Sequence, residues 1–205
     1  MVLHFNKKSI FNLKKNPHLI IPMTKFNPQI VTLKNQKQVV IRQAETKDAE
    51  ELLRCLKTYI SQSDFLPKHD YEIKLTVEQE MDWINSYLKN DNSILLVAEY
   101  ENQLIGNIDV TGSQRERMKH TGMIGMGMLE EWRNSGLGTL LMENAIAWSK
   151  QNAILELLWL QVYTANLSAF HLYKKMGFVG NGTIKNYFKH ETDYFDVMTM
   201  SLEVK

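Results

Sequence analysis

The sequence predicts a single domain in which helices and strands surround one sheet, an α/β or α+β fold. From Gln38 onward, strand-like runs and amphipathic helical segments alternate in the order β-α-α-β-β-β-α-β-α-β-β, without an internal repeat. The chain of 205 residues is long enough to bury a full core. Its 44% hydrophobic and 23% charged residues are typical of an ordinary globular domain.

The first half of this order contains two helices and three strands. Residues 39–42 form a short β-rich run, and apolar residues then recur at helical spacing from Ala49 to Ile60. Thr76 and Gln79 make a capping box that begins a second helix. Strands at 93–100 and 103–110 follow, joined by a tight hairpin. The residues that the second helix is expected to bury are Met81, Ile84 and Leu88.

The second half adds a strand at 121–129, a glycine-rich turn and a helix whose apolar face runs from Leu137 to Trp148. A strand at 157–163 precedes a helix that ends at Gly177, since glycine is favoured just after a helix. Two further strands, at 183–189 and 195–202, complete the domain.

Charge and cysteine content exclude several classes of protein. Seven of the 24 Lys and Arg residues fall within residues 1–37, which contain no acid, leaving 17 basic against 23 acidic side chains afterwards. We therefore expect a basic N-terminal extension over 1–38, interpreted as a tail, and a domain over 39–205. The extension lacks arginine and patterned aromatic residues, which disfavours nucleic-acid binding. No apolar stretch of about 18 residues predicts a membrane span. The single Cys55 is compatible with a cytoplasmic protein.

The turn after strand 121–129 is the most informative motif. Its sequence over 129–139 is Leu-Glu-Glu-Trp-Arg-Asn-Ser-Gly-Leu-Gly-Thr, followed by a helical pattern. A strand that ends in such a turn directs backbone N–H groups and a helix N-terminus at one point, which favours a pyrophosphate. A P-loop would need a lysine after Gly138, and a dinucleotide fingerprint would need a glycine at Leu141. Both common nucleotide folds are thereby disfavoured.

Three signatures occur in one order: the Arg133–Gly138 turn, Asn166 after strand 157–163, and the Leu-Tyr-x-x-x-Gly-Phe run over 172–178. Together they resemble the GNAT acetyltransferase superfamily, over roughly residue 39 to the C-terminus, and most of all bacterial members that act on small amines. The resemblance implies a mixed, mostly antiparallel sheet flanked by helices. It also implies a V-shaped cleft between the fourth and fifth strands, 121–129 and 157–163.

The resemblance implies that acetyl-CoA is the acetyl donor, with no metal. The pantetheine arm would pair with strand backbone near Met126 and Met128. Asn166 would contact the cofactor, and Tyr173 would be the acid that protonates the leaving thiolate. Asn166 is also a good helix N-cap, and Tyr173 lies on an apolar face where a core tyrosine would be ordinary. The residues implied to hold the pyrophosphate are Arg133, Asn134, Ser135, Gly136, Leu137, Gly138 and Thr139.

The sequence does not identify the general base. Some relatives carry a glutamate at the place of Gln161, but an amide has no titratable group. Asp109, Glu130 and His120 are the remaining candidates, and the sequence does not choose among them.

The resulting hypothesis is an N-acetyltransferase that moves an acetyl group from acetyl-CoA to the primary amine of a small molecule such as an amino acid or polyamine. The alternatives are a protein acetyltransferase, a CoA-binding module without turnover, and a nucleic-acid-binding protein that uses its basic arm. No nucleic acid or membrane partner is expected, and a homodimer is compatible with the family. Loop 61–74 is expected to border the acceptor site. Aromatic residues that could line it, or simply pack in the core, are Phe65, Tyr71, Tyr187 and Phe188.

Overall fold

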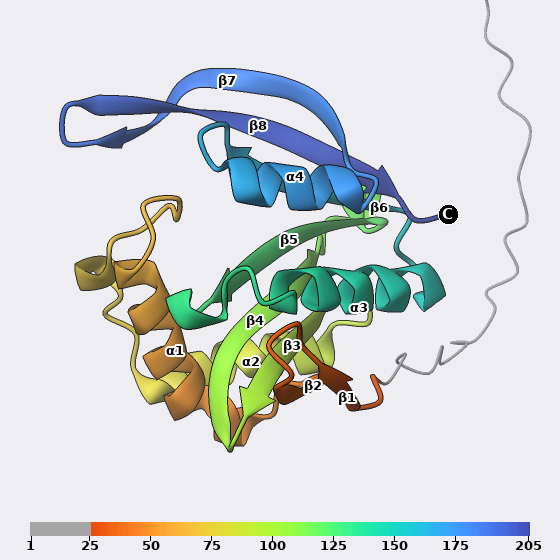
Figure 1. Ribbon diagram of the computed structural model, residues 1–205. Helices are drawn as coiled ribbons and strands as arrows, with labels where there is room; N and C mark the ends of the chain where they lie inside the picture. Colours follow the sequence, from red (N-terminus) through yellow and green to blue (C-terminus); the bar gives the residue numbers. More distant parts are fainter. Residues whose placement is uncertain (1–25) are drawn as a thin grey trace, which may run out of the picture.

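The computed structural model describes residues 26–205, which form one eight-stranded sheet in the order β1-β2-β3-β4-β5-β6-β8-β7 (Figure 1). All neighbouring strands are antiparallel except β5 and β6. The strands are β1 Gln29–Thr32, β2 Gln38–Gln43, β3 Ile94–Tyr100, β4 Gln103–Gly112, β5 Thr121–Met128, β6 Leu157–Tyr163, β7 Val179–His190 and β8 Asp193–Glu203. The helices are α1 Ala49–Ser61, α2 Val77–Lys89, α3 Leu137–Gln151 and α4 Leu167–Lys175.

The helices cover opposite faces of the sheet. A Cβ on Gly127 would lie 2.4 Å from the ring of Tyr59 in α1, so α1 packs on the face to which Gly127 belongs. A Cβ on Gly138, in α3, would lie 3.0 Å from Cε of Met128, the next residue along β5. Because successive strand residues point to opposite faces, α1 and α3 lie on different sides. In Figure 1, α2 lies behind the sheet, α3 crosses in front of it, and α4 lies beneath the long β7–β8 pair.

Every helix and strand predicted from the sequence is present, and the mixed, mostly antiparallel sheet is confirmed. Glu101 and Asn102 both adopt positive φ (50° and 63°), which matches the tight hairpin between β3 and β4. The Thr76–Gln79 capping box begins α2, and Gly177, with φ of 93°, ends α4.

One buried residue was predicted wrongly. Met81 is 40% exposed, whereas Glu80, Ile84 and Tyr87 form the inner face of α2. The three inner residues are spaced at i, i+4 and i+7, and Met81 lies about 100° further round the helix.

The sheet begins before residue 39. Strand β1 pairs with β2 from Gln29 to Thr32, while Phe26 and Leu33 on either side are buried. Residues 26–38, placed in the basic extension by the sequence, therefore include an edge strand. Residues 1–25, with five of the seven lysines of that extension, lie outside the described residues.

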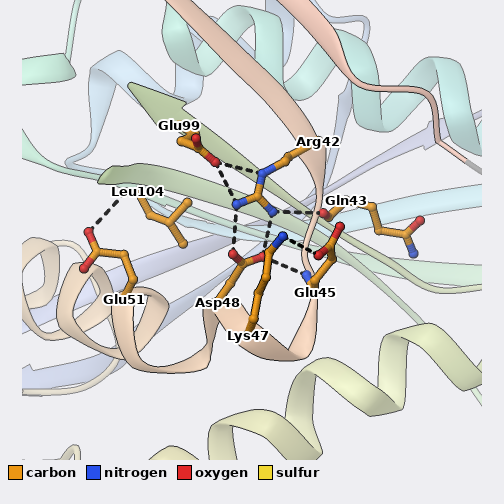
Figure 2. A network of polar contacts seen from close by, with 8 residues as sticks. All are labelled: Arg42, Gln43, Glu45, Lys47, Asp48, Glu51, Glu99 and Leu104. Atoms are coloured by element: carbon orange, nitrogen blue, oxygen red, sulfur yellow. Dashed lines mark hydrogen bonds and ion pairs between the residues drawn. The ribbon is translucent and has the colours of Figure 1, made fainter. Parts of the chain in front are cut away.

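A half-buried arginine ties the first elements together (Figure 2). The Arg42 guanidinium of β2 donates to both carboxylate oxygens of Asp48, at 2.7 and 2.8 Å, and to Glu99 of β3 at 2.8 Å. Burial alone would raise the pKa of Asp48, but the pair with Arg42 and a hydrogen bond from the Glu45 N–H lower it. Removing one partner of a fully buried pair typically costs about 3–5 kcal/mol, because the other charge is left uncompensated. The partial exposure of Arg42 and Glu99 places the cost here below that range.

No helix among the described residues is long and apolar enough to cross a bilayer.

Candidate active site

The central feature of the sheet is a gap between β5 and β6. These strands pair only from Thr121 to Met123, opposite Leu157 to Trp159, and then separate. Strand β5 stays paired with β4 along its whole length, up to Met128 opposite Gly106. Beyond Met123, the edge of β5 that faces β6 therefore pairs with no other strand in the part of the chain that the structure describes. This is the V-shaped cleft predicted between the fourth and fifth strands.

Alternation along β5 shows which backbone groups face the gap. The Leu129 N–H donates to the Ile105 carbonyl at 3.0 Å, and the Thr121 carbonyl accepts from the Ser113 N–H at 3.1 Å. Odd-numbered residues thus direct their backbone groups toward β4. The N–H and C=O groups of Ile124, Met126 and Met128 point the other way, into the cleft.

The glycine turn joins β5 to α3 through a 3₁₀ turn at Glu130–Trp132. Asn134 and Gly136 adopt positive φ, 59° and 95°, and Gly136 is the N-cap of α3. A side chain at Gly136 would be strained by that backbone conformation. The Ser135 hydroxyl is committed to the turn, since it donates to the Trp132 carbonyl at 2.6 Å and accepts weakly from the Leu137 N–H.

The turn presents a cluster of free donors. Within residues 26–205, no acceptor is found for the backbone N–H groups of Asn134, Ser135, Gly136, Gly138 and Thr139. Leu137 is fully buried, so it anchors the helix rather than contacting a ligand through its side chain. Free N–H groups at a helix N-terminus, with the positive end of the helix dipole, suit a phosphate.

A residue outside the predicted set also reaches this turn. The Lys34 N–H, in the turn between β1 and β2, donates to the Ser135 carbonyl at 3.0 Å. The Lys34 side chain runs past Gly136, with Cγ, Cδ and Cε 3.6–3.9 Å from the position of a Cβ there. The β1–β2 turn is held in place by Lys37, whose Nζ lies 4.7 Å from the Trp132 ring centroid. No sequence pattern marks this contact, because it depends on how the edge hairpin packs.

Helix α4 supplies the other two predicted residues. The Asn166 side-chain oxygen caps α4 by accepting from the Ala169 N–H at 3.1 Å. No described residue accepts from its amide nitrogen, so capping and ligand binding are compatible. Tyr173 is half-buried with its ring 6.1 Å from that of Phe178, and burial raises its pKa to about 12.

A carboxylate lies on the opposite face of β4 and β5. Asp109 pairs with Gly125, and a Cβ on Gly125 would lie 2.6 Å from Asp109 Oδ1. Oδ2 accepts from Tyr87 in α2 at 3.0 Å and from Thr111 at 2.8 Å. Burial raises the pKa of Asp109 to about 6, although both hydrogen bonds lower it. Because Gly125 has no side chain, Oδ1 of Asp109 lies directly against β5, the strand that borders the cleft.

Comparison with known proteins agrees with this geometry. Residues 52–178 match the acetyltransferase (GNAT) family. The chain belongs to this family. A crystal structure of a GNAT-family acetyltransferase from Streptococcus pneumoniae is 36% identical, with a TM-score of 0.78, and the match covers 80% of this chain and 99% of that one. The predicted superfamily and the predicted N-acetyltransferase enzyme are thereby confirmed.

Two further relatives are informative. The L-amino acid N-acetyltransferase AaaT of Escherichia coli K12 is 28% identical over 80% of this chain and 97% of its own length. The phosphinothricin acetyltransferase of Sinorhizobium meliloti, solved in complex with acetyl-CoA, shares the fold. Its TM-score is 0.72 at 15% identity, with 84% of this chain and 89% of that chain covered.

In this acetyltransferase the candidates for the general base are well separated. Glu130 is exposed and follows β5, five residues beyond Gly125 or roughly 17 Å along a strand. His120 is also exposed; it lies just before β5, five residues ahead of Gly125. Gln161 lies on β6 two residues beyond Trp159, on the same face, so it borders the cleft across from Gly125. Of these candidates, Asp109 is the one whose carboxylate lies beside the middle of β5.

The loop between α1 and α2 covers the open end of this face. Tyr163 of β6 donates to the Leu66 carbonyl at 3.3 Å and lies 3.1 Å from His190 Nε2. Its ring stacks on Phe188 at 4.2 Å and meets Phe65 edge-on at 5.8 Å. Phe65 and Phe188 therefore join the loop to the β7–β8 pair, whereas Tyr71 and Tyr187 are exposed.

Proposed function

We propose that this protein is an acetyl-CoA-dependent N-acetyltransferase whose acceptor is the primary amine of a small molecule. The observation that carries the proposal is the order of groups along β5. The turn with its free N–H groups comes first, then the unpaired backbone of Met128, Met126 and Ile124, and then Oδ1 of Asp109 beside Gly125. These groups would place the diphosphate of the donor at the turn and its acetyl group near the base.

The donor is bound chiefly by backbone. The free N–H groups of Asn134, Ser135, Gly136, Gly138 and Thr139 hold the pyrophosphate, and Arg133 and Lys34 add positive charge beside it. The pantetheine arm adds to the edge of β5, as in β-augmentation, opposite the free amide of Asn166. A relative of the same fold was solved with acetyl-CoA, which supports this choice of donor.

Asp109 is proposed as the general base. A primary amine has a pKa of about 10.4, so only roughly one molecule in 2,500 is unprotonated at pH 7. A carboxylate at the cleft wall accepts the proton of the bound ammonium, either directly or through one water. The amine nitrogen then attacks the thioester carbonyl, the C–N bond forms, and the C–S bond breaks. The products are the acetamide, CoA thiol and one proton.

Tyr173 is proposed to assist departure of the sulfur. With a pKa near 12 it stays protonated at neutral pH, so its hydroxyl donates a hydrogen bond to the developing thiolate. Full transfer would be uphill, because a thiol has a pKa of about 8.5. The acceptor nitrogen, which must lose protons as the amide forms, supplies the proton that finally rests on sulfur.

The acceptor side favours small molecules. The loop that carries Phe65 and Leu66 reaches across to Tyr163 and narrows the entrance from this face. A protein acetyltransferase would need an open groove at this place. The relative named an L-amino acid N-acetyltransferase supports a small acceptor as well.

The proposal is tested by calorimetric titration with acetyl-CoA, followed by a thiol-release assay across a panel of amines. Saturable binding with CoA release on one class of small amine is the expected result. Binding without turnover on any amine would instead indicate a non-catalytic module or a protein acceptor. Absence of binding would overturn the assignment of the Arg133–Gly138 turn.

A further inference from the structure

A cavity of about 210 Å³ opens next to the closed end of the cleft, on the face that carries Asp109. Thr111, Met123 and Trp159 come from three adjacent strands and form one row across the sheet, since Met123 pairs with both of the others. Met118 and Arg115, from the loop between β4 and β5, complete the wall. The cavity is smaller than the roughly 300–1,000 Å³ typical of sites for drug-sized ligands.

The cavity adjoins the proposed base. Asp109 and Gly125 form the next row on the same face, two residues along β4 and β5, or about 7 Å away. Thr111 links the two rows, because it lines the cavity and its hydroxyl donates to Asp109 at 2.8 Å. An acceptor with its amine beside Asp109 can therefore place another part of itself in the cavity.

The surface of the cavity is mostly apolar. Met118 and Met123 are 42% and 41% exposed, so both present apolar surface to a ligand in the cavity. Methionine side chains adapt to ligands of different shape. The cavity thus suits an aliphatic or thioether group about the size of one side chain.

The rim carries the opposite charge to a carboxylate. The loop from 113 to 120 contains Arg115, Arg117 and Lys119 against the single acid Glu116, and Arg115 is the member of this group that lines the cavity. The Arg115 guanidinium has no hydrogen-bond or ion-pair partner within residues 26–205, although its side chain lines the cavity. A guanidinium fork binds a carboxylate with two parallel hydrogen bonds.

We propose that this cavity is the acceptor subsite and that the acceptor is a free α-amino acid with an apolar side chain. Its side chain occupies the space between Met118, Met123 and Trp159, its carboxylate binds Arg115, and its amine faces Asp109. The inference rests on the proposed function, which leaves the acceptor class open. A polyamine is disfavoured, because its second ammonium would meet the cationic rim.

Matched acceptors separate the contributions of the carboxylate and the apolar side chain to acceptor binding. L-Leucine, L-methionine, 3-methylbutylamine and putrescine are compared at fixed, saturating acetyl-CoA by thiol release. 3-Methylbutylamine is leucine without its carboxylate, so the ratio of the two kcat/KM values isolates that group. We expect leucine and methionine to exceed 3-methylbutylamine by tenfold or more, and putrescine to be the poorest substrate.

Three variants of the same loop test the subsite, and Arg117→Gln is the control. Arg115→Gln should raise KM for leucine by about ten- to a hundredfold, and leave KM for acetyl-CoA and kcat/KM for 3-methylbutylamine unchanged. Arg117→Gln, which removes a neighbouring charge outside the cavity lining, should change leucine KM by less than threefold. Met118→Glu should raise KM for leucine and for methionine to a similar extent.

The outcomes distinguish this inference from the proposed function. Equal loss in the two arginine variants, or no preference for carboxylate-bearing acceptors, would overturn the subsite while acetyl transfer to amines persists. If no amine is acetylated and acetyl-CoA does not bind, both the subsite and the proposed function are overturned.

Discussion

Replacing Asp109 by Asn tests the chemistry most sharply, because the side chain keeps its shape and loses only its ability to take a proton. The pKa of Asp109 is raised from 3.8 to about 6 by burial, which brings it close to the working pH that a general base needs. At pH 7.5 the group is about 97% ionised, and at pH 5 only about 10%. The wild-type kcat/KM should therefore fall roughly tenfold per unit below pH 6. Asp109→Asn should lower kcat by about 10²–10⁴-fold and abolish this acidic limb.

A second variant distinguishes a change in the pKa of the base from general damage to the site. The hydrogen bond from Tyr87 lowers the pKa of Asp109, so Tyr87→Phe should raise that pKa and move the acidic limb to higher pH, by about one unit. The base remains present, so the plateau rate should stay within a few fold of wild type. Both profiles are measured by thiol release from pH 5 to 9, with thermal unfolding as the control. An Asp109→Asn enzyme that keeps its activity and its limb, or a Tyr87→Phe limb that does not move, would refute the assignment.

Three further outcomes follow from individual contacts. Lys34→Ala should raise KM for acetyl-CoA about three- to tenfold without changing kcat. The control Lys150→Ala, at the far end of α3, should leave this KM unchanged. Equal effects of the two variants would exclude Lys34 from the donor site. Tyr173→Phe should lower kcat by about 10–100-fold with acetyl-CoA affinity retained, as measured by calorimetry; an unchanged kcat would leave Tyr173 as a packing residue only. Glu80 is 1% exposed, its Oε1 has no hydrogen-bond partner among residues 26–205, and burial raises its pKa from 4.5 to about 6. The native state thus binds the proton more tightly than the unfolded chain, so Glu80 costs stability as pH rises through 6. Glu80→Gln should then stabilise the protein at pH 7.5 by about 1–2 kcal/mol, or roughly 2–8 °C in Tm, and have little effect at pH 4.5. A Tm gain of equal size at both pH values would contradict this origin.

The sequence predicted those parts of the fold that depend on local patterns. Apolar periodicity located α1 and α3, and the positive φ needed at Gly136 and Gly177 placed the turn and the helix end. Strand β1 was missed because it has four residues, and its Ile30 is 73% exposed, so no alternation marks it.

The candidate site was predictable only where one segment carries it. The phosphate turn lies within a single run of residues, so its sequence was sufficient to propose it. The choice of Asp109 over Glu130 and His120 depended on contacts across elements, with Tyr87 of α2 and Gly125 of β5. Lys34 reached the turn through the packing of an edge hairpin, and no pattern in the sequence encodes that approach.

Donor binding along the free edge of β5 and across the turn can be measured directly by backbone amide shifts. Two-dimensional ¹H–¹⁵N spectra of the full chain are recorded as acetyl-CoA is added. We predict saturable shifts for the amides of Met126, Met128, Gly136 and Gly138, with smaller shifts for Gly127, whose backbone groups face β4. Binding that leaves the turn and the even-numbered amides of β5 unmoved would contradict the account.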